Sequence, residues 1–390
     1  MNTIKAIYKI VTPMFLGGAD NIHAELRPPS FKGVLRFWFR AVALSILGSM
    51  DKVSETERQL FGSTDNKSGQ SRFLLDIQPL QEINEVKHKS PWAGQGSAYL
   101  GYGVIEWDKP NKCNINKRGY ISPGAGFEAN LLLKRPFDEE RECAIKICLT
   151  KALIAVGLFG GLGSRSRKGF GSIVLERLQF KDEILWEAPR SVDELKAKIA
   201  NFFKEISPLF TEIPSFSAFS QKSSVSVYSP SSGISNPLTL LDEVGKEMLR
   251  YRSYGKKREN GKHELPWREE AEQKFKNDHD LMLSVGKGNI PQGHPRRVVF
   301  GLPHNYFFSD RSKINVNSVN NERRASPLFI HIHELCGQYV CIFTILPAVF
   351  LPEKDEIKMG NKPPVKVEVD YSVLTDFTKR FPGIMEVLPK

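Results

Sequence analysis

The feature that most constrains the fold of this chain is a glycine-rich, basic turn that joins its clearest helix to a strand. Residues 160–171 read GGLGSRSRKGFG, with five glycines and no acidic residue. The stretch 139–158 has the apolar period of a helix, and 172–180 (SIVLERLQF) has the composition of a strand. The turn lacks the Gly-Lys-Ser/Thr of a P-loop, and its helix–turn–strand order is the reverse of a dinucleotide-binding fingerprint.

The elements predicted around this turn follow the order of one α+β unit. In chain order they are strand 3–12, helix 33–47, strand 72–79, an inserted hairpin or loop region at 81–125, further strand, helix 139–158 and strand 172–180. Strand–helix–strand, insertion, strand–helix–strand is the βαββαβ order of a ferredoxin-like domain, which would close near residue 182.

The second half has a weaker pattern of the same kind. We expect helices at 191–206, 238–252, 267–283 and 368–380, and strands within 215–237 and at 296–302, 327–335 and 338–346. The last two strands would form a hairpin about Cys336 and Gly337. The pattern allows a second α+β domain.

The charge of the chain points to a polyanionic partner. With 55 Lys and Arg against 44 Asp and Glu, the formal net charge is +11. Charge alone does not distinguish RNA from DNA, an acidic membrane or an acidic protein. A hydrophobic content of 41% argues against disorder. Five scattered cysteines, no signal-peptide pattern and no apolar run of membrane-spanning length lead us to expect a cytoplasmic protein.

The glycine-rich turn is the first candidate binding site. Glycines allow a polyanion backbone to approach the chain closely and leave N–H groups free to face it. Arg165, Arg167 and Lys168 would add charge-assisted hydrogen bonds to phosphate. The alternative is a flexible basic turn with no ligand.

A second candidate is the basic row Lys32, Arg36 and Arg40. The spacing of four residues places all three on one face of the helix predicted at 33–47. The rest of that helix is strongly apolar, so the row suggests that an anion lies opposite it, and phosphate is the obvious candidate. The alternative is a solvated or snorkelling face.

His23 and Arg27 lie in the loop before this helix, ahead of Pro28 and Pro29. A histidine can act as the general base in RNA cleavage by a 2′-OH, which needs no metal. A lone loop histidine is more often a binding or hydrogen-bonding residue, so we place both residues with the RNA-binding candidates.

Two arginine pairs are the strongest basic positions of the second half. Arg296 and Arg297 form one pair and Arg323 and Arg324 the other. Exposed pairs are usually solvated, so they are weaker candidates for a second phosphate contact.

A metal site has some support from residue types only. His331, His333, Cys336 and Cys341 are types that bind zinc, but the spacing HxHxxCxxxxC is not a usual zinc pattern. Buried hairpin residues are the simpler interpretation. The sequence has no triad, no convincing pair of carboxylates and no acidic metal cluster. We therefore expect no catalytic residue and no cofactor.

Five segments together resemble one known family. They are residues 12–41 (TPMFLGGADNIHAELRPPSFKGVLRFWFRA), 60–73 (LFGSTDNKSGQSRF), 99–103 (YLGYG), 160–173 (GGLGSRSRKGFGSI) and 323–335 (RRASPLFIHIHEL). They resemble the RAMP proteins of the type III-B CRISPR effector, the Cmr complex, and its largest RAMP subunit in particular. The glycine-rich loop is typical of RAMP proteins in general.

The resemblance implies two tandem ferredoxin-like (RRM-like, βαββαβ) domains with insertions, at 1–182 and 183–390. It implies a non-catalytic, RNA-binding role in antiviral defence, at the head of the complex near the 3′ end of the CRISPR RNA. The expected partners are CRISPR RNA, target RNA and the other Cmr subunits. By position, the row on helix 33–47 and the glycine-rich loop would line the RNA-binding cleft of the first domain.

The base sequence of the target would then be recognised by pairing with the guide, while the protein contacts the phosphates of the backbone. Phe15 or Tyr102 could stack on a base. Two other functions remain open. One is a metal-independent endoribonuclease that processes CRISPR RNA with His23 as its base. The other is a structural module that contacts only protein.

Overall fold

The first half of the chain builds a five-stranded antiparallel sheet in the order β10-β9-β1-β8-β2. The computed structural model describes residues 3–18, 20, 22–64, 69–92, 94–134, 139–308 and 312–388. The strands of this sheet are β1 (Thr3–Ile10), β2 (Phe73–Pro79), β8 (Gly126–Leu133), β9 (Ile173–Phe180) and β10 (Glu183–Glu187).

Alternation along β1 sets the two faces of this sheet. Ile4, Ala6 and Tyr8 are buried, whereas Lys5 is exposed, as expected for a sheet covered on one side. The helices of this half are α1 (Pro28–Leu47), α2 (Met50–Phe61) and α4 (Glu139–Phe159). The buried side chains of the sheet, α1 and α4 share one core.

The second half builds a four-stranded antiparallel sheet in the order β18-β19-β11-β21. Its strands are β11 (Ser224–Tyr228), β18 (Leu328–Leu335), β19 (Gln338–Ile345) and β21 (Met385–Leu388). The predicted hairpin is confirmed: Leu335 pairs with Gln338. Cys336 and Gly337 between them both have positive φ, which a two-residue type I′ turn requires.

Both sheets have the same connectivity. Numbering the four strands of each unit in chain order, β1, β2, β8 and β9 lie in the spatial order 4-1-3-2, and so do β11, β18, β19 and β21. Helices follow the first and third strand of each unit; in the second unit these include α6 (Pro237–Arg252) and α8 (Ser372–Thr378). The mixed α+β class with antiparallel sheets is confirmed. The division at residue 182 stays a prediction, and β10 lies just beyond it.

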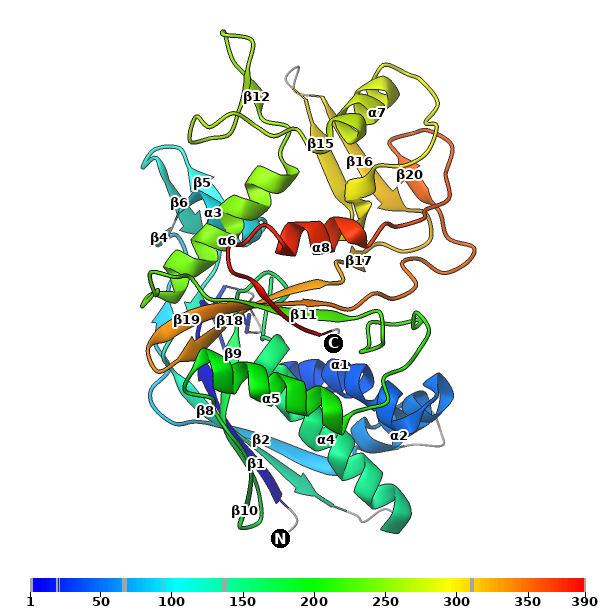
Figure 1. Ribbon diagram of the computed structural model, residues 1–390. Coiled ribbons are helices and arrows are strands. Elements are labelled where there is room, and N and C mark those ends of the chain that lie inside the picture. Colours follow the sequence, from blue (N-terminus) through cyan, green and yellow to red (C-terminus); the bar gives the residue numbers. More distant parts are fainter. Residues whose placement is uncertain are drawn as a thin grey trace.

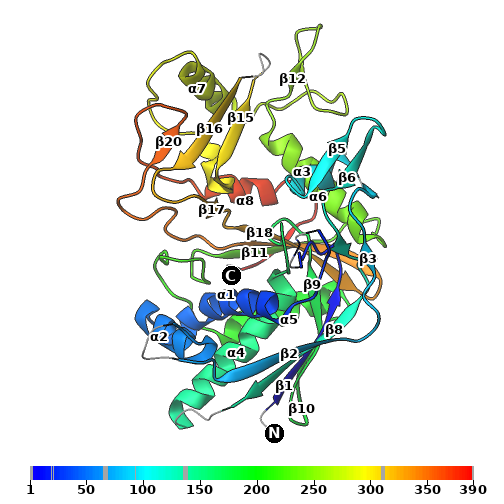
Figure 2. The same ribbon diagram turned by 180° about the vertical axis from the view of Figure 1, so that it is seen from behind.

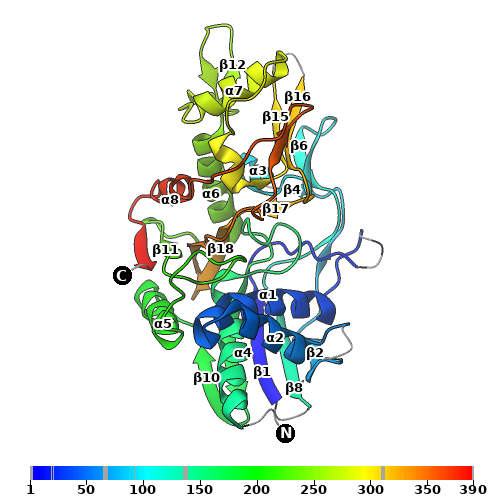
Figure 3. The same cartoon turned by 90° about the vertical axis from the view of Figure 1, so that its right-hand side faces the viewer.

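The two sheets are stacked with helices between them, as Figures 1 and 3 show. One face of the second sheet, with Val225 and Ile342, shares the core of α4 and α5 (Val192–Glu205). Its other face, with Ile330 and Phe343, packs with α6 and α8. The second sheet is therefore buried on both faces, which explains the nearly continuous burial of β18.

An insertion of the first half reaches across to the second. Its elements are α3 (Gln95–Leu100), β3 (Glu85–Val86), β4 (Pro91–Trp92), β5 (Ile105–Asp108), β6 (Cys113–Asn116) and β7 (Tyr120–Ile121). α3 lies directly on α6, side by side in Figure 2. Gly96 and Gly245 meet there so closely that a Cβ on either would overlap backbone atoms of the other helix.

The remaining elements are α7 (Lys276–Gly286), β12 (Lys256–Lys257), β13 (His263–Glu264), the 3₁₀ helix η1 (Arg296–Phe300), β14 (Gly301–Leu302), β15 (His304–Phe307), β16 (Lys313–Ser318), β17 (Arg324–Ala325) and β20 (Ile357–Met359). Side chains of α7, η1, β14, β15, β16 and β20 share a small core of their own, in the upper part of Figure 1. Within the described residues, no helix is long and apolar enough to cross a membrane.

Three predicted elements need correction. The helix predicted at 33–47 begins at Pro28, because prolines fit the first turn of a helix, where their missing N–H costs nothing. The helix predicted at 267–283 begins only at Lys276. The stretch predicted as strand 296–302 is mostly η1, because Asp278 Oδ1 and Oδ2 accept hydrogen bonds from the first two N–H groups of its turn.

Candidate nucleic-acid interface

The glycine-rich turn between α4 and β9 is packed tightly against the protein's own backbone. A Cβ at Gly163, whose φ is +85°, would lie 2.5 Å from Phe15 O. The N–H of Ser164 donates to Phe15 O at 2.9 Å, and that of Gly171 to Pro13 O at 2.9 Å. These glycines therefore allow close internal packing, and these amides are not free for a ligand. The turn is a fixed platform, and of its three basic residues only Arg165 is exposed.

The same turn attaches to the edge of the second sheet. Lys168 forms a parallel bridge with Ile330 of β18, and the N–H of Ile330 donates to Arg167 O at 3.1 Å. The N–H of Ile332 donates to Ser172 Oγ at 3.1 Å. The turn thus joins both halves, and its basic residues lie at their junction.

The side chain of Arg167 makes its contacts within this attachment. Its Nη1 donates to Ser326 O at 2.7 Å, and its guanidinium carbon lies 4.4 Å from the ring centroid of Phe329 and 5.1 Å from that of Phe37. Burial lowers the pKa of Arg167 to about 10. Such cation–π contacts between α1, the turn and β18 stabilise the junction.

Lys168 and Arg252 bring two buried side-chain nitrogens to the junction. Lys168 Nζ and Arg252 Nε are buried, and neither has a hydrogen-bond partner among the described residues. Burial, followed by the charges of Arg252, Arg165 and Arg167, lowers the pKa of Lys168 to about 7. Burial also lowers the pKa of Arg252, whose guanidinium carbon lies 4.4 Å from the Phe300 ring centroid.

Arg165 and Arg323 extend this group to the surface. Both residues are exposed as a whole. Partial burial of the Arg165 guanidinium, then the charge of Arg323, lowers the pKa of Arg165. Arg165, Lys168, Arg252 and Arg323 are called the junction cluster below. Within the described part of the chain, the groups that shift the pKa values of Arg165, Lys168 and Arg252 are other cations and tyrosines.

The row on α1 has a different environment. Arg36 Nε donates to Glu57 Oε1 of α2, and Arg40 Nη1 donates to the same atom at 2.9 Å. Lys32 Nζ lies 5.3 Å from the Phe73 ring centroid, and burial, then Arg36, lowers the pKa of Lys32. The anion opposite the row is therefore a buried glutamate of the same chain. Two guanidinium groups share one carboxylate, so positive charge remains at this surface.

Glu57→Gln is expected to lower the free energy of unfolding by about 1–3 kcal/mol, because it leaves Arg36 and Arg40 facing each other without an anion. Urea denaturation measures this, and Glu353→Gln, at an exposed position, is the control. If the row also binds RNA, the variant binds RNA more tightly than the natural chain. Unchanged stability would contradict the structural role of Glu57.

The other predicted residues are mostly paired within the chain. His23 Nδ1 lies 2.5 Å from Asp20 Oδ2, and that carboxylate raises the pKa of the exposed His23. Arg27 Nε lies 3.9 Å from Glu25 Oε2. The raised pKa favours the protonated form of His23, which is suited to binding an anion.

The members of the two arginine pairs of the second half have different partners in the structure. Arg296 Nη2 lies 2.8 Å from Asp370 Oδ2. Arg297 Nη1 donates to Arg252 O at 2.9 Å, so it holds a member of the junction cluster in place. Arg324 Nη2 donates to Val349 O at 3.0 Å. Of the four arginines, only Arg323 is in the junction cluster.

The histidines considered for zinc are buried in β18 and hydrogen-bonded. His331 Nδ1 donates to Gly160 O at 2.7 Å, since a carbonyl can only accept, and its Nε2 lies 3.2 Å from His333 Nδ1. Burial lowers the pKa of His331 to about 4. Cys341 is buried and Cys336 is exposed. The described residues contain no group of three or more His, Cys, Asp or Glu that could hold a metal.

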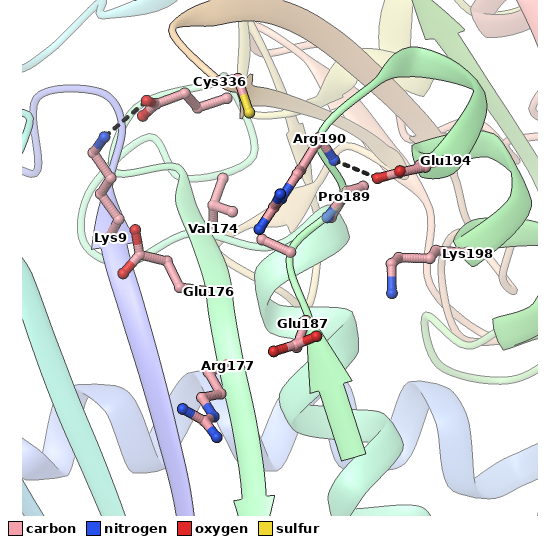
Figure 4. A pocket seen from close by; sticks show the side chains of 12 residues that line it. Lys9, Val174, Glu176, Arg177, Glu187, Pro189, Arg190, Glu194, Lys198 and Cys336 are labelled. Atoms are coloured by element: carbon pink, nitrogen blue, oxygen red, sulfur yellow. Dashed lines mark hydrogen bonds and ion pairs between the residues drawn. The ribbon is translucent and has the colours of Figure 1, made fainter. Parts of the chain in front are cut away.

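A cavity of about 630 Å³ lies between β1, β9, the first turns of α5 and the β18–β19 turn (Figure 4). Its lining contains four cationic and four acidic side chains: Lys9, Arg177, Arg190, Lys198, Glu176, Glu187, Glu194 and Glu334. Lys9 Nζ pairs with Glu334 Oε1 at 2.8 Å. This balanced charge does not favour a polyanion, in contrast to the junction cluster.

Arg252, which lies 84 residues beyond Lys168, was not among the residues predicted from the sequence. A signal was present: Leu241, Gly245, Met248 and Arg252 follow the helical period on one face of α6, and the first three are buried. A charged residue in phase with a buried face is a candidate for a buried interaction.

Comparison with known proteins identifies the family. The model of the RAMP superfamily matches residues 7–174. The CRISPR system Cmr subunit Cmr1-2 of Pyrococcus furiosus is 30% identical over 181 residues, which cover 43% of this chain and 92% of that protein. The chain belongs to the Cmr1 family of RAMP proteins. The family expected from the sequence motifs is thus confirmed.

Another Cmr1 protein aligns with nearly the whole chain. Cmr1-1 of Pyrococcus furiosus is 27% identical over 373 residues, covering 91% of this chain and 88% of its own length. The crystal structure of Cmr1 from Pyrococcus furiosus in its apo form has the same fold, with a TM-score of 0.56 at 22% identity over 99% of both chains. A chain of the type III-B Cmr-beta complex bound to cognate target RNA has a TM-score of 0.50 at 13% identity, over 97% of this chain and 99% of that one.

Proposed function

We propose that this chain is a non-catalytic, RNA-binding subunit of a cytoplasmic type III-B CRISPR effector, placed near the 3′ end of the CRISPR RNA, where it helps bind target RNA. Its partners would be CRISPR RNA, target RNA and the other Cmr subunits. The family membership supports this proposal, as does the matching chain in a complex bound to cognate target RNA. The shared 4-1-3-2 strand order supports two tandem ferredoxin-like domains.

The observation that carries the RNA-binding proposal is the junction cluster. Four cations converge where the glycine-rich turn meets the second sheet, and two of them have buried nitrogens without a partner among the described residues. A phosphate backbone supplies the missing negative charge. Arg165 and Arg323 are exposed and can reach it directly, whereas Lys168 and Arg252 add positive potential from behind.

Arg165→Glu is expected to weaken binding of single-stranded RNA by about tenfold or more at low salt. It should also make the salt dependence of binding shallower, because a phosphate contact is lost. Fluorescence anisotropy over a salt series measures both. Arg177→Glu is the matched control, with the same charge change at an exposed position of β9 on the open face of the first sheet.

Equal losses in Arg165→Glu and Arg177→Glu would mean that only net charge matters, and the proposed site would be wrong.

A second experiment tests for cleavage. A CRISPR repeat RNA is incubated for a long time with the protein in the absence of metal, and its length is then measured. We expect the RNA to remain intact. Specific cleavage that is lost in His23→Ala would overturn the non-catalytic role.

A further inference from the structure

Tyr102 is an aromatic side chain presented to solvent beside the junction cluster. Its side chain is 62% exposed, and it lies between Gly101 and Gly103 at the end of α3. Phe15, the other aromatic residue considered for stacking, is buried at 1% exposure, so no base can reach its ring. Of these two candidates, Tyr102 alone offers a ring face to a ligand.

The backbone that carries Tyr102 is held rigidly. A Cβ at Gly101 would overlap Ile105 and lie 3.1 Å from the ring of Phe170 in the glycine-rich turn. The preceding helix α3 is fixed to α6, where Ser97 N and Oγ both donate to Asp242 Oδ1, at 2.9 and 3.0 Å. A fixed exposed ring loses little conformational entropy when a ligand binds to it.

Arg165 places a cation beside the ring. Its guanidinium carbon lies 5.9 Å from the Tyr102 ring centroid, and its φ of +64° is unusual for a residue other than glycine. Gly103 makes room for this arrangement, because a Cβ there would lie 3.1 Å from Arg165 Nη2. The charge that acts on Arg165 besides Tyr102 is that of Arg323, another cation. The pair thus combines an open aromatic face with a positive charge that lacks an anion.

We propose that Tyr102 is a stacking platform for one unpaired base of bound RNA, with Arg165 contacting the phosphate next to that base. This rests on the proposed RNA-binding function and adds a defined base subsite to it. Stacking accepts any base through its π face, which suits a subunit that leaves sequence reading to guide–target pairing. A phosphate alone would need the arginine and not the exposed ring.

The test compares single-stranded RNA with copies that carry one abasic nucleotide at successive positions. Natural protein should lose about 5- to 50-fold in affinity at one position of the series. Tyr102→Ala should lose a similar factor on intact RNA and should not respond to the abasic nucleotide at that position. Tyr102→Phe should bind like the natural chain, and Tyr102→Leu should bind like the alanine variant.

Trp107→Ala is the control variant. Trp107 belongs to β5 of the same insertion and is 57% exposed, so the variant removes an exposed aromatic of similar size, and we expect unchanged affinity. If Tyr102→Ala binds intact RNA as the natural chain does, or if no abasic position weakens binding, the stacking subsite is wrong. The Arg165→Glu result would still stand in that case. If the natural chain itself showed no salt-sensitive binding of RNA, the proposed function would be wrong.

Discussion

Replacing Gly245 with alanine is expected to lower the free energy of unfolding by about 3 kcal/mol, at the upper end of overpacking costs. A Cβ at Gly245 would overlap the backbone of Gly96 in α3, and one at Gly96 would overlap the backbone of Asp242 and Lys246 in α6. Because the obstructing atoms are backbone, no rotamer change can relieve the overlap, and the two helices must separate. Guanidinium denaturation of the full chain measures the loss.

Gly33→Ala is the matched control for this prediction. Gly33 is also a helical glycine, but it is exposed on α1 and a Cβ there would have nothing within 4 Å. Alanine should stabilise the chain by about 0.5–1 kcal/mol through its helix propensity. If both variants changed stability equally, the close approach of α3 and α6 would not hold the insertion. Because Tyr102 lies two residues after the end of α3, Gly245→Ala should also weaken RNA binding.

Local patterns predicted most of the long helices and most strands of the two large sheets, because the hydrophobic period is a property of neighbouring residues. The apolar period of 139–158 and the alternation of 3–12 correspond to α4 and β1, with ends shifted by one or two residues. α2 was missed: its stretch MDKVSETERQLF is polar, and only Val53, Glu57, Leu60 and Phe61 are buried. The one acidic residue in that set holds Arg36 and Arg40.

The candidate site could be predicted only in part, because charge partners come from distant positions. The basic row on α1 suggested an anion, but no local pattern identified it as Glu57. The glycine-rich turn was found by composition, yet its glycines contact backbone at Pro13 and Phe15 and its amides are used there. The lowered pKa of Lys168 depends, after burial, on Arg252, which only the packing of α6 brings near.

Lys168→Met is expected to make the free protein more stable at pH 7. In the folded chain the pKa of Lys168 is lowered from 10.5 to about 7, by burial first and then by Arg252, Arg165 and Arg167. The residue as a whole is partly exposed, but Nζ itself is buried. The unfolded chain therefore holds this proton more tightly between pH 7 and 10.5, so the residue reduces stability by on the order of 3–5 kcal/mol near pH 7. Methionine has a similar length and removes this cost.

The sign of the pH dependence gives the decisive measurement. A folded pKa below the unfolded one means that the cost of Lys168 is fully present below about pH 7 and disappears as the pH rises toward 10.5. The stability difference between Lys168→Met and the natural chain should therefore shrink from pH 7 to pH 10, where other groups titrate equally in both. RNA affinity should fall in the same variant, since an anion at the junction would relieve the repulsion that the free protein tolerates. The opposite result is a variant that is less stable than the natural chain by an amount independent of pH. It would show that Lys168 has a partner and that the junction does not lack a negative charge.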